Sequence, residues 1–105
     1  MADLSQVEWV ARLNQDSEAV ILDVRTEEEV EAGHIPNSKN LDIYKGQEFL
    51  EEINKLDKSK TYFVYCRSGA RSAQACALME QQGFEAAFNL LGGFMEWDGE
   101  VEFAN

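Results

Sequence analysis

Short apolar runs alternate along this chain with segments whose apolar residues recur at helical spacing. The runs that favour strands cover residues 19–22, 40–43, 61–65 and 87–91. The segments that favour helices cover residues 5–14, 26–33, 47–56 and 72–82. Strands separated by helices of about ten residues pair in parallel and are covered by helices on both faces. The pattern therefore predicts an α/β fold with a central parallel sheet of about four or five short strands.

Two of the predicted helices begin with a capping box, in which a Ser or Thr side chain and a Glu three residues later exchange hydrogen bonds with the backbone. Ser5 pairs in this way with Glu8, and Thr26 with Glu29. Gly33 ends the second predicted helix, because glycine commonly follows the last helical turn.

The 105 residues suit one domain, residues 1–105, because two separate cores of about 50 residues each would be marginal. The longest unbroken apolar runs, Tyr62–Cys66 and Ala75–Met79, have five residues each, whereas a membrane span needs about 20. The first residues lack the basic patch and apolar core of a secretory signal. We therefore expect a cytoplasmic protein without a membrane partner. No long exposed apolar stripe is evident, so we expect a monomer.

The chain carries 20 acidic and 9 basic residues, and its net charge of −11 argues against a nucleic-acid partner. The charge is unevenly distributed, since residues 58–79 contain no acid. This stretch holds four basic residues, Lys58, Lys60, Arg67 and Arg71. Two cysteines and one histidine are too few for a disulfide scaffold or for a four-ligand zinc site. We expect neither a metal nor another cofactor, and a cysteine with a special role is expected to be reactive.

Cys66 directly follows the clearest strand signal, residues 61–65, and the next five residues lead into a predicted helix. In an open α/β sheet, ligands bind at the carboxyl ends of strands, where loops enter helix N-termini. The amide groups of residues 67–71 have no partners in a preceding turn and can converge on one point, with Gly69 allowing the loop to curl. The loop is therefore a candidate anion site with Cys66 at its base.

A thiol in this position should ionise more readily than a free thiol, because amides, a helix N-terminus and two guanidinium groups favour the thiolate. Lowering the pKa of Cys66 from about 8.5 to about 6.5 would raise the thiolate fraction at pH 7 from about 3% to about 75%. The alternative is a small buried residue at a strand end. Arg67 and Arg71 argue against that alternative, since apolar sites do not gather arginines.

The segment Cys66-Arg67-Ser68-Gly69-Ala70-Arg71 resembles the active-site loop of the rhodanese family of sulfurtransferases, in its single-domain form. Three other segments match in order and spacing: Asp23-Val24-Arg25 with Glu29, Gly33-His34-Ile35-Pro36 with Asn40, and Gly92-Gly93-Phe94-Met95-Glu96-Trp97. The resemblance covers the chain from about Val20 to Trp97. It implies a rhodanese-like fold and a cysteine that carries a sulfane sulfur as a persulfide.

The resemblance further implies that Cys66 is the catalytic residue, which takes sulfur from a small anionic donor such as thiosulfate and passes it to cyanide or a thiol. The substrate-binding residues would be those of the loop, Arg67, Ser68, Gly69, Ala70 and Arg71. Both guanidinium groups are placed to attract the dianion and to stabilise the charge of departing sulfite. A sulfur-accepting protein is an equally open acceptor, because no residue selects among these partners.

Other protein functions share parts of this sequence pattern. A phosphatase or arsenate reductase has a similar loop with five residues between Cys and Arg, whereas Cys66 and Arg71 enclose four, and the sixth position after the cysteine holds Ser72. A serine cannot bind a tetrahedral oxyanion as a guanidinium would. Rhodanese-like regulatory modules that have lost the cysteine are disfavoured because Cys66 is present. A sulfur relay to a protein partner stays open.

Several further residues are candidates for catalysis, but a structural role is the simpler interpretation of each. Arg25 and Glu29 are four residues apart and can pair, while Asp23 can brace the neighbouring loops. The only histidine, His34, is a candidate base for Cys66, although a thiolate already formed needs none. Cys76 falls on an inward helical stripe and is expected to be a packing residue, the alternative being a thiol that resolves the persulfide.

Overall fold

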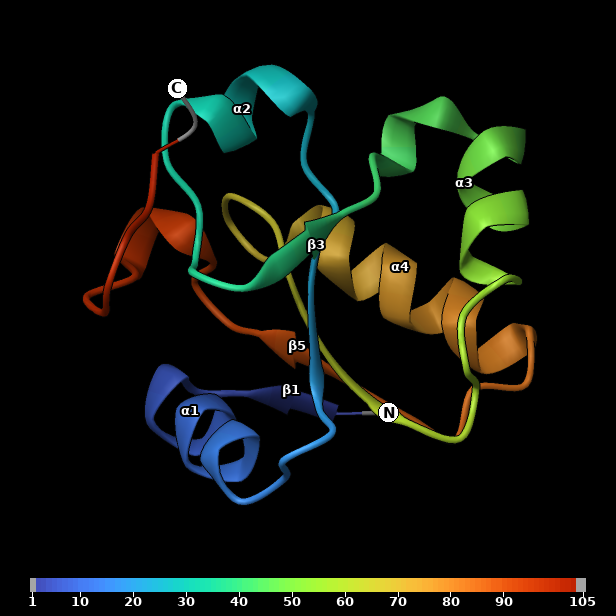
Figure 1. The fold of residues 1–105 in the computed structure, drawn as a ribbon, viewed down its shortest axis with the longest axis horizontal. Helices are drawn as coiled ribbons and strands as arrows, with labels where there is room; N and C mark the ends of the chain where they lie inside the picture. Colours follow the sequence, from blue (N-terminus) through green and yellow to red (C-terminus); the bar gives the residue numbers. More distant parts are fainter. Residues whose placement is uncertain (1, 104–105) are drawn as a thin grey trace.

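The computed structural model describes residues 2–103, which form a five-stranded sheet with helices on both faces (Figure 1). The strand order is β1-β5-β4-β2-β3, and all neighbouring strands are parallel. The strands are β1 (Ala2–Leu4), β2 (Val20–Asp23), β3 (Ser38–Asn40), β4 (Thr61–Tyr65) and β5 (Ala86–Leu90). The predicted α/β class and the parallel sheet are confirmed.

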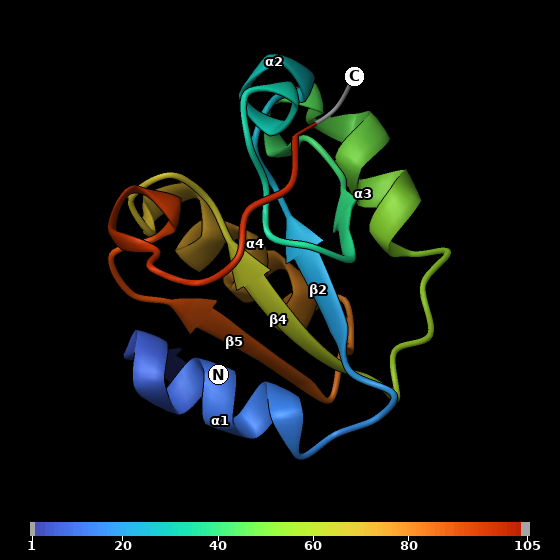
Figure 2. The same ribbon diagram turned by 60° about the vertical axis from the view of Figure 1, so that its left-hand side comes forward.

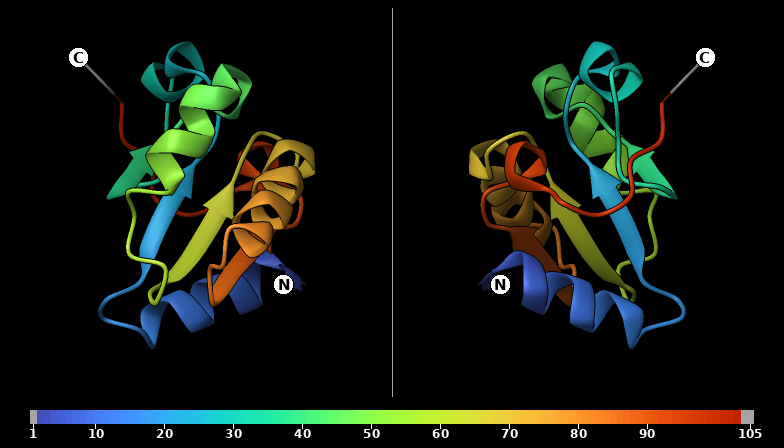
Figure 3. Two further views of the ribbon diagram at one scale, coloured as in Figure 1. Left: turned by 90° about the vertical axis from the view of Figure 1, so that its right-hand side faces the viewer. Right: turned by 90° about the vertical axis from the view of Figure 1, so that its left-hand side faces the viewer.

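Two helical layers enclose the sheet (Figure 2). The helices are α1 (Gln6–Asn14), α2 (Glu27–Glu31), α3 (Gln47–Ile53) and α4 (Ala70–Gln81), with 3₁₀ turns η1 (Ile43–Lys45) and η2 (Phe94–Glu96). Helices α3 and α4 cover one face and α1 covers the other, while α2 lies beyond the carboxyl end of β2 (Figure 3). No helix within residues 2–103 is long and apolar enough to cross a membrane.

The central strand β4 shows why the sheet is covered on both sides. Its side chains alternate between two cores, since Tyr62 and Val64 pack toward α3 and α4, whereas Phe63 and Tyr65 pack toward α1. Trp9 of α1 meets the ring of Phe63 edge-on at 5.7 Å between centroids. A strand that is buried on both faces has a continuous run of apolar residues in its sequence. The predicted bounds of β4, residues 61–65, match the structure for this reason.

The edges of the sheet differ from expectation. Strand β1 was not foreseen, because it has three residues and only Leu4 is buried. The predicted strand at 40–43 is wrong in position, since β3 spans Ser38–Asn40 and residues 43–45 form η1. Asp42 explains the shift, because its side chain accepts a hydrogen bond from the backbone of Tyr44 and starts the 3₁₀ turn.

Helix boundaries follow the capping signals. Thr26 and Glu29 form the complete capping box that opens α2. Ser5 caps α1 by accepting a hydrogen bond from the amide of Glu8 at 3.3 Å, but the Glu8 side chain does not accept one from the Ser5 amide, so the capping box predicted there is only half formed. Helix α3 ends at Ile53, three residues earlier than predicted, and α4 begins at residue 70 rather than 72. The earlier start of α4 brings its first turn directly against the loop after β4.

Candidate active site

The loop after β4 is short and sharply curved. Cys66 follows the last residue of the strand, and only three residues separate it from α4, which begins at Ala70. Gly69 occupies the cap position with a φ of 106°, a conformation that disfavours any side chain. No side chain caps the N-terminus of α4. The first amides of the helix are therefore free to interact with the cysteine sulfur.

The sulfur of Cys66 is fully buried and surrounded by hydrogen-bond donors. The amide of Gly69 lies 3.1 Å from Sγ and the hydroxyl oxygen of Ser72 lies 3.3 Å from it. Burial alone would raise the pKa of the Cys66 thiol, but hydrogen bonds from the Ser72 hydroxyl and from the amides of Ser72, Gly69 and Ser68 outweigh it. The net effect lowers the pKa, in the direction expected from the sequence.

Arg71 is held in place by Glu29 of α2. Its two terminal nitrogens donate to the two carboxylate oxygens at 2.7 and 2.9 Å, a bidentate pair. The hydrogen bond from the Arg71 guanidinium lowers the pKa of Glu29 to about 2; burial acts in the opposite direction, and the hydrogen bonds of the Thr26 cap lower the pKa further. The ring of Tyr44 stacks on the same guanidinium at 5.1 Å. The predicted pairing of Glu29 with Arg25 is wrong.

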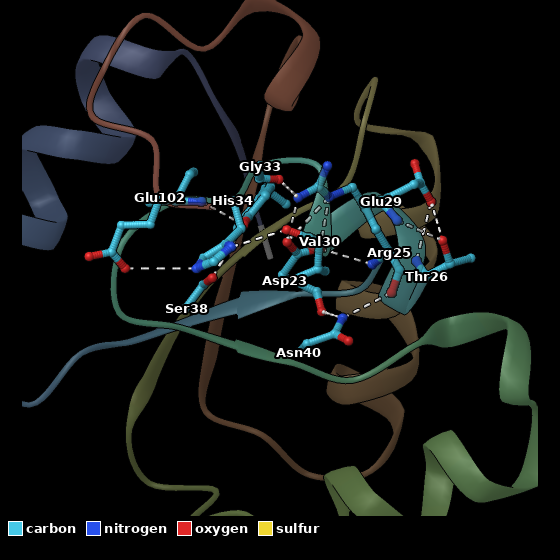
Figure 4. A network of polar contacts seen from close by, with 12 residues as sticks. Asp23, Arg25, Thr26, Glu29, Val30, Gly33, His34, Ser38, Asn40 and Glu102 are labelled. Carbon is cyan, nitrogen blue, oxygen red and sulfur yellow. Dashed lines mark hydrogen bonds and ion pairs between the residues drawn. The ribbon is translucent and has the colours of Figure 1, made fainter. Parts of the chain in front are cut away.

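Arg25 pairs instead with Asp23, and both side chains are buried (Figure 4). The guanidinium lies 2.8 Å from the Asp23 carboxylate and donates to the carbonyl of Gly33 at 2.8 Å. It also lies over the ring of Phe94 at 4.5 Å from the centroid. The amide of Asn40 donates to the carbonyls of residues 23 and 25. These contacts connect β2, β3 and η2, so Asp23 and Arg25 brace the loops near the site.

The double glycine after β5 supports the cysteine loop from behind. The amide of Phe94 donates to the carbonyl of Cys66 at 2.8 Å, and that of Met95 to the carbonyl of Arg67 at 2.9 Å. Gly93 has a φ of 58°, and a Cβ there would lie 2.4 Å from the carbonyl oxygen of Arg67. Only glycine allows this approach, so the double glycine is part of the site's framework.

The remaining loop side chains point to solvent. Arg67, Ser68 and Ala70 are exposed, and no residue within 2–103 pairs with the Arg67 guanidinium. The two predicted arginines therefore differ, since Arg71 is fixed by its carboxylate partner and Arg67 is not. Ser68 and Ala70 contribute to the loop through their backbone rather than their side chains.

Within residues 2–103, neither His34 nor Cys76 forms a hydrogen bond with the candidate nucleophile. The imidazole Nδ1 of His34 lies 3.1 Å from the carbonyl of Val30, and Nε2 lies 3.7 Å from Glu102 (Figure 4). These contacts engage both ring nitrogens away from Cys66. Burial raises the pKa of Cys76 to about 12, which leaves it as an unreactive thiol. Both cysteines are free, and no group of three His, Cys, Asp or Glu side chains within residues 2–103 is arranged for a metal.

Sequence reasoning missed two residues behind the sulfur, Ser72 as a hydrogen-bond donor and Asn89 as its neighbour on β5. The hydroxyl of Ser72 lies within hydrogen-bond distance of both Cys66 Sγ and the side-chain oxygen of Asn89, and it can donate to one of them at a time. Only Asn89 gave a signal in the sequence, as a polar residue in an otherwise apolar segment. Ser72 follows the loop arginine and Asn89 interrupts the apolar run of β5.

Comparison with known proteins identifies the class. Residues 6–100 match the family model of the rhodanese-like domain. A rhodanese-like domain protein of Staphylococcus aureus has the same fold, with a TM-score of 0.85, 30% identity and all of both chains covered. The chain belongs to the rhodanese-like family, as the sequence resemblance indicated.

Three relatives in this family are named for sulfur transfer. A sulfurtransferase of Allochromatium vinosum is 38% identical over 86 residues, with 82% of this chain and 78% of that protein covered. The thiosulfate sulfurtransferase GlpE of Coxiella burnetii is 40% identical over 78 residues, with 74% of this chain and 70% of that protein covered. YtwF of Bacillus subtilis is 35% identical over 103 residues, with 98% of this chain and 96% of that protein covered. This chain is thus a rhodanese-like protein whose relatives include proteins named sulfurtransferases.

Proposed function

We propose that this protein transfers a sulfane sulfur from thiosulfate, or a related small anionic donor, to cyanide or a thiol through a persulfide on Cys66. The observation that carries the proposal is the environment of the sulfur, where the Gly69 amide, the Ser72 hydroxyl and the open N-terminus of α4 converge. These groups stabilise negative charge on sulfur. A nucleophilic cysteine needs this stabilisation because the thiolate is its reactive form.

In the first half-reaction the Cys66 thiolate attacks the outer sulfur of thiosulfate. A bond forms between Sγ and that sulfur, and the bond to the sulfonate sulfur breaks with its electron pair leaving on sulfite. Thiolate and thiosulfate dianion become persulfide anion and sulfite dianion, so charge balances without a proton or an oxidant. The new charge lies on the outer sulfur, where amides of the loop after β4 can stabilise it.

In the second half-reaction an acceptor attacks the outer sulfur. The electron pair of the sulfur–sulfur bond returns to Sγ and regenerates the thiolate. The donors that stabilise the resting thiolate also stabilise this leaving group, so a lowered pKa at Cys66 assists discharge. A covalent intermediate between two separate substrates gives ping-pong kinetics.

The two arginines have different roles in this scheme. Arg67 is exposed and its guanidinium has no partner within residues 2–103, so it can turn toward an approaching dianion. Arg71 is held by both oxygens of Glu29 and supplies a fixed positive charge beside the loop. We assign attraction of the donor to Arg67 and orientation of the loop to Arg71.

The arrangement of Arg71 also favours sulfur transfer over phosphoryl or arsenate chemistry. An oxyanion enzyme needs a guanidinium free to clamp a tetrahedral substrate. Both terminal nitrogens of Arg71 are bound to Glu29, and the next position holds Ser72, whose hydroxyl points toward Cys66. A protein thiol fits the same scheme as a small thiol acceptor.

Steady-state kinetics with thiosulfate and cyanide test the proposal. We expect parallel double-reciprocal lines when both substrates are varied, no turnover for Cys66→Ser, and near-normal turnover for Cys76→Ser. The second variant is the matched control, because it removes the other thiol of the chain. Turnover retained by Cys66→Ser would reject the proposal.

A further inference from the structure

A chain of hydrogen bonds runs from the sulfur of Cys66 to the edge of the sheet. Ser72, in the first turn of α4, reaches both Cys66 Sγ and Asn89 Oδ1, and Asn89 Nδ2 donates to Asp3 of β1 at 3.0 Å. The sheet register places Asp3 directly beside Asn89. Ser72 is 0% exposed and Asn89 is 2% exposed, so the contacts among Cys66, Ser72 and Asn89 are shielded from water, whereas Asp3 at the end of the chain of contacts is exposed.

The neighbours of Asn89 fix the orientation of its side-chain amide. Nδ2 donates to the Asp3 carboxylate at 3.0 Å and to the carbonyl of Gly69 at 3.2 Å. Both partners are oxygens that accept hydrogen bonds, and together they use the two hydrogens of the amide nitrogen. A flipped amide would place its own oxygen against these two oxygens. Oδ1 of Asn89 must therefore face the hydroxyl of Ser72.

The hydroxyl of Ser72 consequently has two acceptors and one hydrogen. One acceptor is Cys66 Sγ at 3.3 Å, and the other is Oδ1 of Asn89 at a shorter separation. When the hydroxyl hydrogen of Ser72 points to the sulfur, the buried Oδ1 of Asn89 faces the Ser72 oxygen and receives no hydrogen bond from it, which is unfavourable. A hydrogen turned to Asn89 leaves the sulfur with backbone donors alone.

We propose that Asn89 sets the reactivity of Cys66 by competing with its sulfur for the hydroxyl hydrogen of Ser72. In the thiolate, the charge on Sγ draws the hydrogen to sulfur against this competition. In the persulfide the charge has moved to the outer sulfur, and the hydrogen returns to Asn89. This second part rests on the proposed sulfur transfer. Asn89 thus disfavours the bare thiolate and favours the sulfur-loaded enzyme, as a positioning residue that acts through Ser72.

Of the two variants that test this competition, only Asn89→Leu leaves the charged groups around the sulfur unchanged. Arg71 acts on it from α4, the exposed Arg67 is next to it in the loop, Glu29 of α2 acts on it through Arg71, and Asp3 of β1 lies behind Asn89. Replacing Asn89 by Leu removes the competing oxygen and changes none of these charges. Replacing Asn89 by Asp keeps an acceptor and adds a negative charge.

The test measures the pKa of Cys66 from the pH dependence of its alkylation by iodoacetamide, in a Cys76→Ser background. We expect Asn89→Leu to increase the acid dissociation constant of the thiol about tenfold. Asn89→Asp should decrease it. The added charge of Asn89→Asp would produce this decrease even without competition, so the dependence of the Asn89→Leu shift on Ser72 is what distinguishes competition from a packing or charge effect.

Ser72→Ala completes the cycle, because it removes the contested hydrogen. In that background Asn89→Leu should leave the dissociation constant unchanged. An equal shift with and without Ser72, or no shift at all, would overturn the inference. Circular dichroism checks the fold of each variant, and Asn89→Ala replaces Asn89→Leu if the latter does not fold.

The alkylation readout does not depend on sulfur transfer. A protein that never forms a persulfide but shows the Ser72-dependent shift would reject the proposed function and retain the competition for the hydrogen. A protein that forms the persulfide normally but shows no shift would reject this inference alone.

Discussion

Replacing Glu29 by Gln isolates the charge interaction that holds Arg71. Gln at this position can still accept the capping hydrogen bonds of Thr26, so α2 keeps its capping box. The Glu29 side chain is 29% exposed and that of Arg71 is 16% exposed. The variant therefore loses a bidentate, partly buried ion pair without losing the helix start.

The magnitude follows from the pKa of Glu29, which falls from 4.5 to about 2. A tenfold change in a protonation equilibrium corresponds to about 1.4 kcal/mol, so an unscreened pair would contribute about 3 kcal/mol. Solvent screening at a partly exposed site reduces this, and we expect Glu29→Gln to lower the free energy of unfolding by about 1–2 kcal/mol at pH 7.

The difference should depend on pH in one direction. The folded-state pKa of Glu29 is depressed, so its contribution is present above about 4.5 and is lost as the pH falls toward 2. Urea unfolding of both proteins at pH 7 and near pH 2.5 measures this change, with Glu28→Gln as a control for the loss of one acidic charge in α2. An equal difference at both pH values would refute the reasoning.

Two further variants probe the loop after β4 and its support. Arg67→Ala should raise the KM for thiosulfate about three- to tenfold with little change in the cyanide half-reaction, and added salt should weaken thiosulfate binding more in the wild type than in the variant. An effect confined to cyanide would contradict this role. Gly93→Ala should lower the free energy of unfolding by about 3 kcal/mol or more, because its Cβ would meet the Arg67 carbonyl in a left-handed backbone conformation. Thermal melting measures this loss, and Gly46→Ala is a comparison at positive φ with no atom within 4 Å of the added Cβ.

Central elements of the fold were predictable because local signals and burial agree there. Strand β4 is buried on both faces, and its bounds follow from an apolar run alone. Edge strands β1 and β3 depend on pairing with a neighbour rather than on their own composition, and their three residues each give too short a pattern. The capping box at Thr26 was readable because both of its partners lie within four residues of each other.

The candidate site was predictable only in its local part. The loop from Cys66 to Arg71 is contiguous in sequence and sits at a strand end, so its geometry follows from general rules for α/β sheets. The pairing of Arg71 with Glu29 spans 42 residues, and that of Ser72 with Asn89 spans 17. Such contacts depend on where the sheet places α2, α4 and β5, which helical spacing does not reveal.

The most direct test of the account is the intact mass of the protein after reaction with thiosulfate. The reduced protein is incubated with thiosulfate, freed of excess reagent and measured before and after cyanide, with Cys66→Ser as the control. The account predicts a gain of one sulfur, about 32 Da, that cyanide removes and the variant never acquires. A protein that gains no sulfur from thiosulfate, mercaptopyruvate or a persulfide donor, or a Cys66→Ser variant that gains it equally, would contradict the account.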